Sequence, residues 1–597
     1  MKKSAIILVI CALAAIPAFT QVLNDYVSAV KGDTLVIKDY AEVGNKPSSL
    51  INAVELDLAA PAGRVYQLVS GKWYPHSRQL NSPVGRSIQI VGDAKTPLVQ
   101  SKAAAMPPMI TGYTDGTNTQ DGGLVGFRNN MTIKNLILSP AVDNGAFGWA
   151  CIDANAPDFT LTMNNVLMEH TKWVMLESNG AAGTTFIFSN CYFVNLSGQA
   201  CRRNGGVYDN VGNNTDSIVV ENCTHVMAQG MLYKMRNFPC TKVSFNHNTF
   251  VNCSGNVFET CGYQNNWSVT NNLFVNSNVQ CYRSGLDYGE TDQDRLPMGI
   301  INVRAFPSTT GLFAGLTEAG RKILVDANGV YWDPALDAMV TTLNAGTGVN
   351  GFKTWVSQMI TMNTRTQGLF NDNATYPKLV EGTWIKGGNP NFTKPADLMT
   401  TQVTALIAWS VGTVDTTSTN VMPDWRTASN PAATNFIYPD WPIPVDLSYT
   451  NAAYLTAGYA GMPLGDLNWF PAKKTTWAAQ AATEHAAIET ALNNGTVLVT
   501  AVHDRNAKPS RFELNQNYPN PFNPTTTISF SVLESGNVTL KVYDAMGHEV
   551  AALVNGYRKA GQSYEVNFDA SRLSSGTYVY TLSGDNFKVS KKMLLMK

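Results

Sequence analysis

A short motif that recurs about every 25 residues between positions 131 and 276 limits the folds open to this chain. Two copies, VSFNHNTFVN at 243–252 and WSVTNNLFVN at 267–276, align without gaps, and the same frame begins at 131, 161, 186 and 218. A period of this length is typical of stacked repeats, in which one unit alone cannot bury its apolar face.

Apolar and polar positions alternate within each copy. The first two apolar columns are Met131, Leu161, Phe186, Ile218, Val243 and Trp267, followed two residues later by Ile133, Met163, Phe188, Val220, Phe245 and Val269. Period-two alternation predicts a strand with one buried face. A third column holds Asn135, Asn165, Asn190, Asn222, His247 and Asn271. Asparagine tolerates a left-handed backbone, which suits a sharp corner, and its side chain can bond to the next repeat.

We therefore predict an all-β fold whose main part is a right-handed parallel β-helix with a helical and irregular C-terminal cap, followed by a small antiparallel β-sandwich. Propellers need about 40 to 45 residues per repeat, and leucine-rich horseshoes need a different leucine spacing. The predicted parts are a signal peptide (1–20), the β-helix (21–333), its cap (334–499), a polar linker (500–511) and the sandwich (512–597).

Charge and hydropathy narrow the location and the partners. Lys plus Arg number 43 against 44 Asp plus Glu, so the chain lacks the basic excess of a nucleic-acid binder. Two lysines followed by the apolar run Ala5–Ala15 indicate a secretory signal peptide, and no later stretch is long enough to span a membrane. We expect a secreted or cell-surface protein. The cysteines between Cys151 and Cys281 can form disulfides or remain buried thiols, and their spacing leaves both open.

The last 86 residues resemble the type A C-terminal sorting domain of the type IX secretion system. The resemblance rests on NYPNPFNPTTTI at 517–528, VYDAMGHEV at 542–550, SGTYVYTL at 575–582 and the basic end KVSKKMLLMK. It implies a source similar to Bacteroidota, export by the type IX machinery through residues 512–597, and association with the outer membrane or cell surface.

The repeat region resembles the pectin-lyase-like β-helix superfamily. LVSGKWY and SIQIVGD precede its repeats, and DLSYTNAAYLTAGYAGMPLGDLNWF at 446–470 is similar to the tail of secreted Bacteroidota β-helix proteins. Many members of the superfamily are polysaccharide lyases or hydrolases, so the resemblance implies polysaccharide as a partner.

Charged residues recur once per repeat, before each asparagine corner, and each directly follows an apolar residue. They are Asp153, Glu177, Asp209, Lys234, Glu259 and Arg283. If the apolar residue points inward, the charged one points outward, and the series forms a ladder on one outer face. His225 and His247 lie in columns of the repeat itself and are predicted to be structural.

Three neighbouring acids, Asp153, Glu177 and Asp209, repel one another unless something neutralises them, and calcium accepts several carboxylate oxygens. This arrangement resembles pectate lyases, in which calcium bridges a uronate carboxylate and a basic residue removes the neighbouring proton. The resemblance implies Lys234, Arg236 and Arg283 as candidate bases. Arg202, Arg203 and Glu259 are candidate substrate-binding residues on the same face. Alternatively, the ladder is a solvated face whose ion pairs contribute little.

Two functions remain open from the sequence. One is a β-helix that binds, and as a lyase-like enzyme cleaves, an acidic polysaccharide. The other is an adhesin or structural surface protein without catalytic activity, in which the solenoid serves as a stiff rod.

Overall fold

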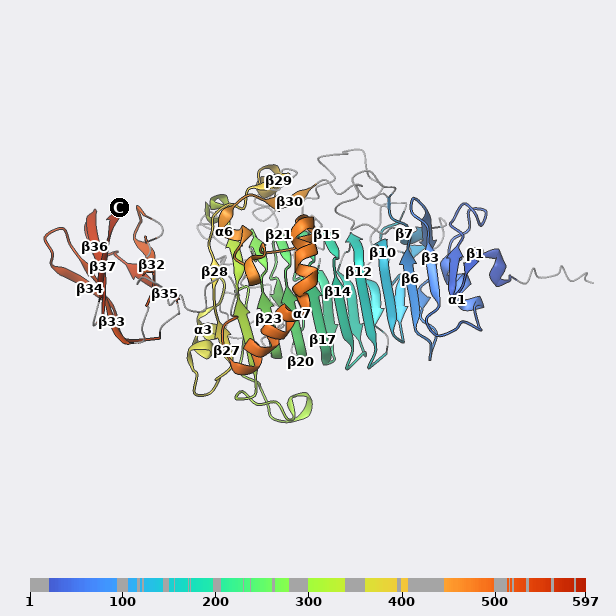
Figure 1. Ribbon diagram of the computed structural model, residues 1–597, viewed down its shortest axis with the longest axis horizontal. Coiled ribbons are helices and arrows are strands. Elements are labelled where there is room, and N and C mark those ends of the chain that lie inside the picture. The colour runs from blue at the N-terminus through green and yellow to red at the C-terminus, as the bar shows by residue number, and fades with distance from the viewer. Residues whose placement is uncertain are drawn as a thin grey trace, which may run out of the picture.

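The computed structural model describes most of the chain as a long stack of strands followed by a small sandwich (Figure 1). The described residues are 21–93, 106–114, 119–120, 123–142, 150–154, 156–169, 171, 173–196, 206–228, 230–236, 238–259, 263–278, 299–338, 360–394, 399–405, 445–498, 513–514, 516–517, 520–532, 536–559, 563–584 and 587–597.

Successive motif copies pair in parallel and in register. Met131 lies opposite Leu161, Leu161 opposite Phe186, and Val243 opposite Trp267. We call these strands column 1: β3 (Val65–Leu68), β6 (Ile88–Gly92), β10 (Met131–Ser139), β12 (Thr160–Glu169), β14 (Thr185–Ser189), β17 (Thr215–Glu221), β20 (Cys240–Asn246), β23 (Gln264–Thr270), β25 (Lys322–Asp326) and β27 (Leu379–Glu381). The predicted repeat register is confirmed.

Each coil continues beyond its column 1 strand into a second column of parallel strands; β10 and β12 themselves run through the corners at Asn135 and Asn165. Column 2 further contains β4 (Trp73–His76), β7 (Met109–Thr114), β15 (Tyr192–Leu196), β18 (Thr224–Ala228), β21 (Thr249–Cys253), β24 (Leu273–Val275), β26 (Asn328–Tyr331) and β28 (Trp384–Ile385). Column 3 is a separate seven-stranded parallel sheet: β5 (Leu80–Asn81), β9 (Val125–Phe127), β11 (Ala150–Ala154), β13 (Val174–Asn179), β16 (Gly206–Val211), β19 (Tyr233–Lys234) and β22 (Phe258–Glu259). A mostly β chain with large parallel sheets is thus confirmed.

The asparagine corners have the predicted left-handed backbone. Their φ angles run from 52° at Asn222 to 57° at Asn271, and His247 has the same conformation at 53°. Asn165 Nδ2 donates to Asn135 Oδ1 at 2.8 Å, so one side chain bonds the next coil as predicted. The interior is filled by the apolar columns, including Trp267, Phe186 and Phe188, all with 0% exposure. The predicted inward columns are confirmed.

The stack is longer than the repeat in the sequence. Beyond residue 333, β27 and β28 still pair with β25 and β26, although a long stretch of chain separates them: Ile323 lies opposite Leu379, and Asn328 opposite Trp384. At the other end, β1 (Val27–Lys31) pairs antiparallel with β2 (Thr34–Ile37), near α1 (Ser49–Leu56). An antiparallel first strand ends the parallel pairing and protects the sheet edge.

A C-terminal strap, residues 445–498, returns along the outside of the stack (Figure 1). Its elements are β30 (Asp446–Tyr449), which pairs with β29 (Phe392–Lys394), then α6 (Ala452–Leu455), two short 3-10 turns (Tyr459–Gly461 and Leu467–Trp469) and α7 (Pro471–Asn494). Helix α7 ends at Gly495 with φ 66°, as the sequence predicted. The first half of the strap packs on the apolar outer face of column 2, which includes Leu167, Tyr192 and Val251.

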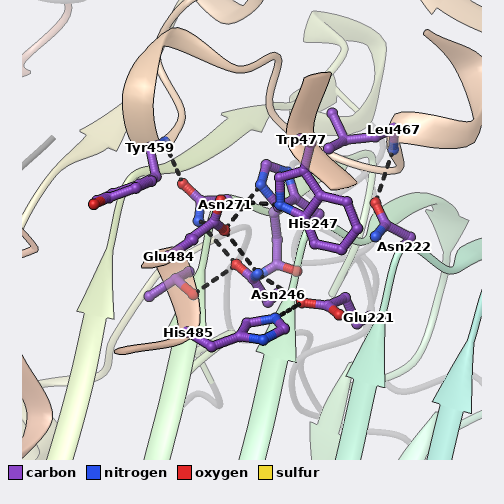
Figure 2. A network of polar contacts seen from close by, with 12 residues as sticks. Glu221, Asn222, Asn246, His247, Asn271, Tyr459, Leu467, Trp477, Glu484 and His485 are labelled. Carbon is purple, nitrogen blue, oxygen red and sulfur yellow. Dashed lines mark hydrogen bonds and ion pairs between the residues drawn. The ribbon is translucent and has the colours of Figure 1, made fainter. Parts of the chain in front are cut away.

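Helix α7 lies over the asparagine corners and buries a network of polar side chains (Figure 2). Glu484 accepts hydrogen bonds from Asn246 Nδ2 at 2.8 Å, Asn271 Nδ2 at 3.1 Å and Trp477 Nε1 at 3.0 Å. His247 Nε2 lies 3.1 Å from Glu484 Oε1, and both side chains are fully buried. The network thus joins two consecutive coils to a helix more than 200 residues later in the chain.

Two structural predictions about single residues have clear outcomes. His225 and His247 are both buried with 0% exposure, which confirms their structural role. Cys151, Cys191, Cys223, Cys240 and Cys253 are free thiols. Cys191 and Cys223 lie side by side on adjacent coils, where the Cys191 amide donates to Cys223 Sγ at 3.3 Å. Of the two cysteine alternatives, these five therefore follow the buried-thiol one.

The C-terminal residues form two packed antiparallel sheets around one apolar core. One sheet contains β31 (Glu513–Leu514), β32 (Thr525–Ser531) and β35 (Ser563–Asp569). The other contains β34 (Glu549–Arg558), β33 (Gly536–Tyr543), β36 (Gly576–Gly584) and β37 (Phe587–Leu595) in that order.

Replacing Glu484 with Ala tests the network under α7. Burial alone would raise the pKa of Glu484, but His247 and the hydrogen bonds from Asn246 and Trp477 lower it below the ordinary 4.5. The ionised carboxylate therefore stabilises the fold above pH 4.5, and this stabilisation is lost as the pH falls through the lower folded pKa. At pH 7 we expect Glu484→Ala to lower the free energy of unfolding by about 3 to 5 kcal/mol, because buried donors lose their partner.

Denaturant unfolding at pH 7 and pH 3 measures this effect. Glu489→Ala is the matched control, since Glu489 lies on the same helix and its side chain is 54% exposed. Equal unfolding free energies for the Glu484 and Glu489 variants at pH 7 would contradict the network.

Candidate functional site

The predicted charged ladder lies on column 3, one residue per coil. Asp153 pairs with Glu177, Glu177 with Asp209, and Asp209 with Lys234, which in turn pairs with Glu259. The inward neighbours Ile152, Leu176 and Tyr208 belong to the core. Neighbouring positions in a sheet are about 4.8 Å apart, so the described carboxylates form a continuous row.

The centre of the ladder is a buried ion cluster. Arg236 donates two hydrogen bonds to the Asp209 carboxylate, from Nε to Oδ1 at 2.8 Å and from Nη2 to Oδ2 at 3.0 Å. Lys234 Nζ lies 3.5 Å from Asp209 Oδ2, and the Trp173 indole donates to the same oxygen at 2.8 Å. The Asp209 side chain is 1% exposed and that of Lys234 10%. The ladder is therefore not the uniformly solvated face of the alternative interpretation.

Arg236 has an unusual backbone, with φ 44°. A left-handed conformation is uncommon for a residue other than glycine, asparagine or aspartate, and it costs free energy unless the surroundings stabilise it. In this structure the conformation accompanies the two-pronged contact with Asp209. Left-handed backbone of this kind is concentrated at functional sites.

Glu177 and Asp153, beside the cluster, are partly exposed. Burial raises the pKa of Glu177, and the charges of Asp153 and Asp209 raise it further. Burial also raises the pKa of Asp153, although a hydrogen bond from Gln79 Nε2 opposes this. Lys234 and Arg236 contact Asp209, whereas Glu177 and Asp153 lie beside this cluster. Because the side chains of Glu177 and Asp153 are partly exposed, a ligand can reach them.

Several predicted site residues cannot be placed. Arg202, Arg203 and Arg283 lie outside the described residues, and so does the side chain of Glu259. Of the predicted bases, Lys234 and Arg236 are brought together, but both contact Asp209.

A calcium ion does not fit at Asp209 in this arrangement. Both carboxylate oxygens already accept hydrogen bonds, and two cations neutralise the charge for which calcium was invoked. Among the residues that the structure describes, no group of three His, Cys, Asp or Glu side chains is positioned to hold a metal ion.

Two residues of the site were not predicted. Trp173 and Gln79 lie outside the ladder column, yet each donates to one of its acids. Trp173 directly precedes Val174, the first residue of β13, and Glu177 of the ladder lies on the same strand. The predicted strand could therefore have indicated that Trp173 lies near the ladder. Gln79 precedes β5, whose two residues carry too little alternation to reveal a strand.

The end of the chain is similar to a known protein family: residues 516–596 match the family model of the secretion system C-terminal sorting domain. No curated protein matches the chain. The protein thus carries a sorting domain of the type IX secretion system, which directs it to the cell surface or the extracellular space. None of the described helices is long and apolar enough to cross a membrane.

Substituting Gln for Glu177 distinguishes a free carboxylate from a calcium ligand. Because the folded pKa is raised, the ionised group destabilises the fold above that pKa and has no effect well below the ordinary 4.5. We expect Glu177→Gln to stabilise the protein by a few tenths of a kcal/mol, at about pH 7 only, in urea unfolding. Destabilisation that requires added calcium would show that the carboxylate binds the ion.

Proposed function

We propose that the stack is a right-handed parallel β-helix of the pectin-lyase-like kind and that its ladder face binds polysaccharide at the cell surface. The buried Asp209 cluster carries this proposal. Burying a carboxylate with two cations is expensive and is weak as a stabilising device, so the arrangement favours a role other than stability. The unusual Arg236 backbone supports the same conclusion.

Partly exposed carboxylates and an indole are suitable groups for sugars. Glu177 and Asp153 can accept hydrogen bonds from sugar hydroxyls, and the partly buried Trp173 ring offers an apolar surface with a polar edge. The coil spacing of about 4.8 Å is similar to the length of one pyranose unit, so a sugar chain can run along the ladder. Asp209, with Arg236 and Lys234, forms the rigid floor of this site.

Binding is better supported than cleavage. A base for β-elimination must be uncharged and directed at the substrate, whereas Lys234 and Arg236 are both engaged with Asp209. We therefore place lyase activity second, and a rod or adhesin that binds no glycan is the competing outcome.

Binding to a panel of acidic and neutral polysaccharides tests the proposal. The panel contains pectate, alginate, glucuronan and neutral glucans, with calcium or with a chelator, and calorimetry measures affinity. We expect at least one polysaccharide to bind, and we expect Glu177→Gln and Asp153→Asn each to lower its affinity about tenfold or more. The control substitution Glu489→Gln, at a residue of α7, should leave the affinity unchanged. Ultraviolet absorbance from unsaturated ends would reveal elimination in the same samples.

Failure to bind any polysaccharide would favour the rod or adhesin. Binding that survives both ladder substitutions would place the site elsewhere on the molecule.

A further inference from the structure

The sorting domain presents a face of mainly hydroxyl and lysine side chains on the outer side of its four-stranded sheet. Residues of this face alternate with core residues along three neighbouring strands. We call it the lysine face: Thr539, Lys541 and Tyr543 on β33; Thr577, Val579, Thr581 and Ser583 on β36; Lys588, Ser590, Lys592 and Leu594 on β37.

The strand register arranges these side chains in rows. One row contains Thr539, Ser583 and Lys588, and the next contains Lys541, Thr581 and Ser590. Thr539 and Ser583 are hydrogen-bonded through their hydroxyls at 2.8 Å, as are Thr581 and Ser590. These bonds link the strands across the face and hold its centre in one arrangement.

The lysines of this face differ in their partners. Lys541 pairs with Glu549 of β34 at 2.8 Å. Lys588 and Lys592 are exposed, and neither side chain forms an ion pair with any residue that the structure describes. Among the residues that the structure describes, these two ammonium groups have no acidic partner, and they stand beside the hydroxyls of Ser583 and Ser590.

The lysine face is directed away from the solenoid. Figure 1 shows β33, β34, β36 and β37 on the far side of the sandwich, with β32 and β35 nearer to the stack. The ion pair between Lys386, which follows β28, and Glu565 joins the solenoid to β35 of the other sheet at 2.7 Å. The lysine face is therefore accessible while the sorting domain is still attached to its cargo.

We propose that the lysine face is the surface on which the sorting domain docks to an acidic protein surface of the export machinery, with Lys588 and Lys592 as the specificity-determining charges. Complementary charge fixes register and speeds association, and the more exposed hydroxyls of Ser583 and Ser590 add directional hydrogen bonds. An anionic membrane is a poorer match, because membrane-binding segments gather about 4 to 8 basic residues and this face has two free lysines.

Charge reversal in the full-length protein tests the proposal in a bacterium that has a type IX system. We expect Lys588→Glu with Lys592→Glu to reduce the surface-exposed fraction at least about tenfold, with the protein retained in the periplasm, because like charges then meet at the interface. Replacing both lysines with Arg should preserve export. Surface proteolysis and cell fractionation measure the distribution, and the melting temperature of each purified variant verifies folding.

The control reverses two exposed charges away from this face, Lys559→Glu with Arg572→Glu, in the loops after β34 and β35. This control variant changes the net charge by the same amount as the reversal of Lys588 and Lys592, and we expect it to be exported normally. Normal export of the Lys588 and Lys592 reversal, or equal retention of the control, would overturn the proposal. So would lysine-dependent binding of the wild-type chain to anionic lipid vesicles with export of the reversal unchanged.

Discussion

The left-handed corner that follows the column 1 strands of the repeat is the constraint on which the rest of the structure depends; its residues are Asn135, Asn165, Asn190, Asn222, His247 and Asn271. A corner of fixed geometry at the same place in these six coils leaves only one register in which they can pair. That register places Met131 against Leu161 inside the stack, and it equally places Asp153 against Glu177 outside it. A slip of one residue would move both sets to the opposite face, so the core and the ladder are specified together.

The strap satisfies the polar groups that such corners create. A stack of asparagines buried under a helix needs a partner for each amide, since an unpaired buried group costs about 1 to 3 kcal/mol. Glu484 accepts from the corner residue Asn271 and from Asn246, which precedes the corner at His247. The side chains of Asn222 and Asn271 accept from the backbone amides of Leu467 and Tyr459 (Figure 2). The strap thus adds long-range contacts to a local repeat in which each coil contacts its neighbours. Leu498 and Asp326 are 172 residues apart in the sequence, and Asn468 and Asn190 are 278 apart.

Sequence periodicity predicted whatever repeats in each coil. The columns through Met131 and Asn135, the buried His247 and the ladder register all follow from alternation and spacing. Periodicity carries no information about contacts made once. The hydrogen bonds from Arg236 to Asp209 depend on a turn after β19. Glu484 is one residue of an Ala-rich helix, and the sequence of this helix does not show which part of the stack the helix packs on. Strands β27 and β28 are two or three residues long, too short to show alternation.

The most direct test of the account is carbodiimide labelling of carboxyl groups in the folded protein, read out residue by residue by mass spectrometry. The strand register places a partly exposed Glu177 beside an Asp209 that two cations and an indole enclose. We therefore expect rapid labelling of Glu177, and labelling of Asp209 only when the protein is unfolded. Rapid labelling of Asp209 in the folded protein would contradict both the buried cluster and the binding face built on it.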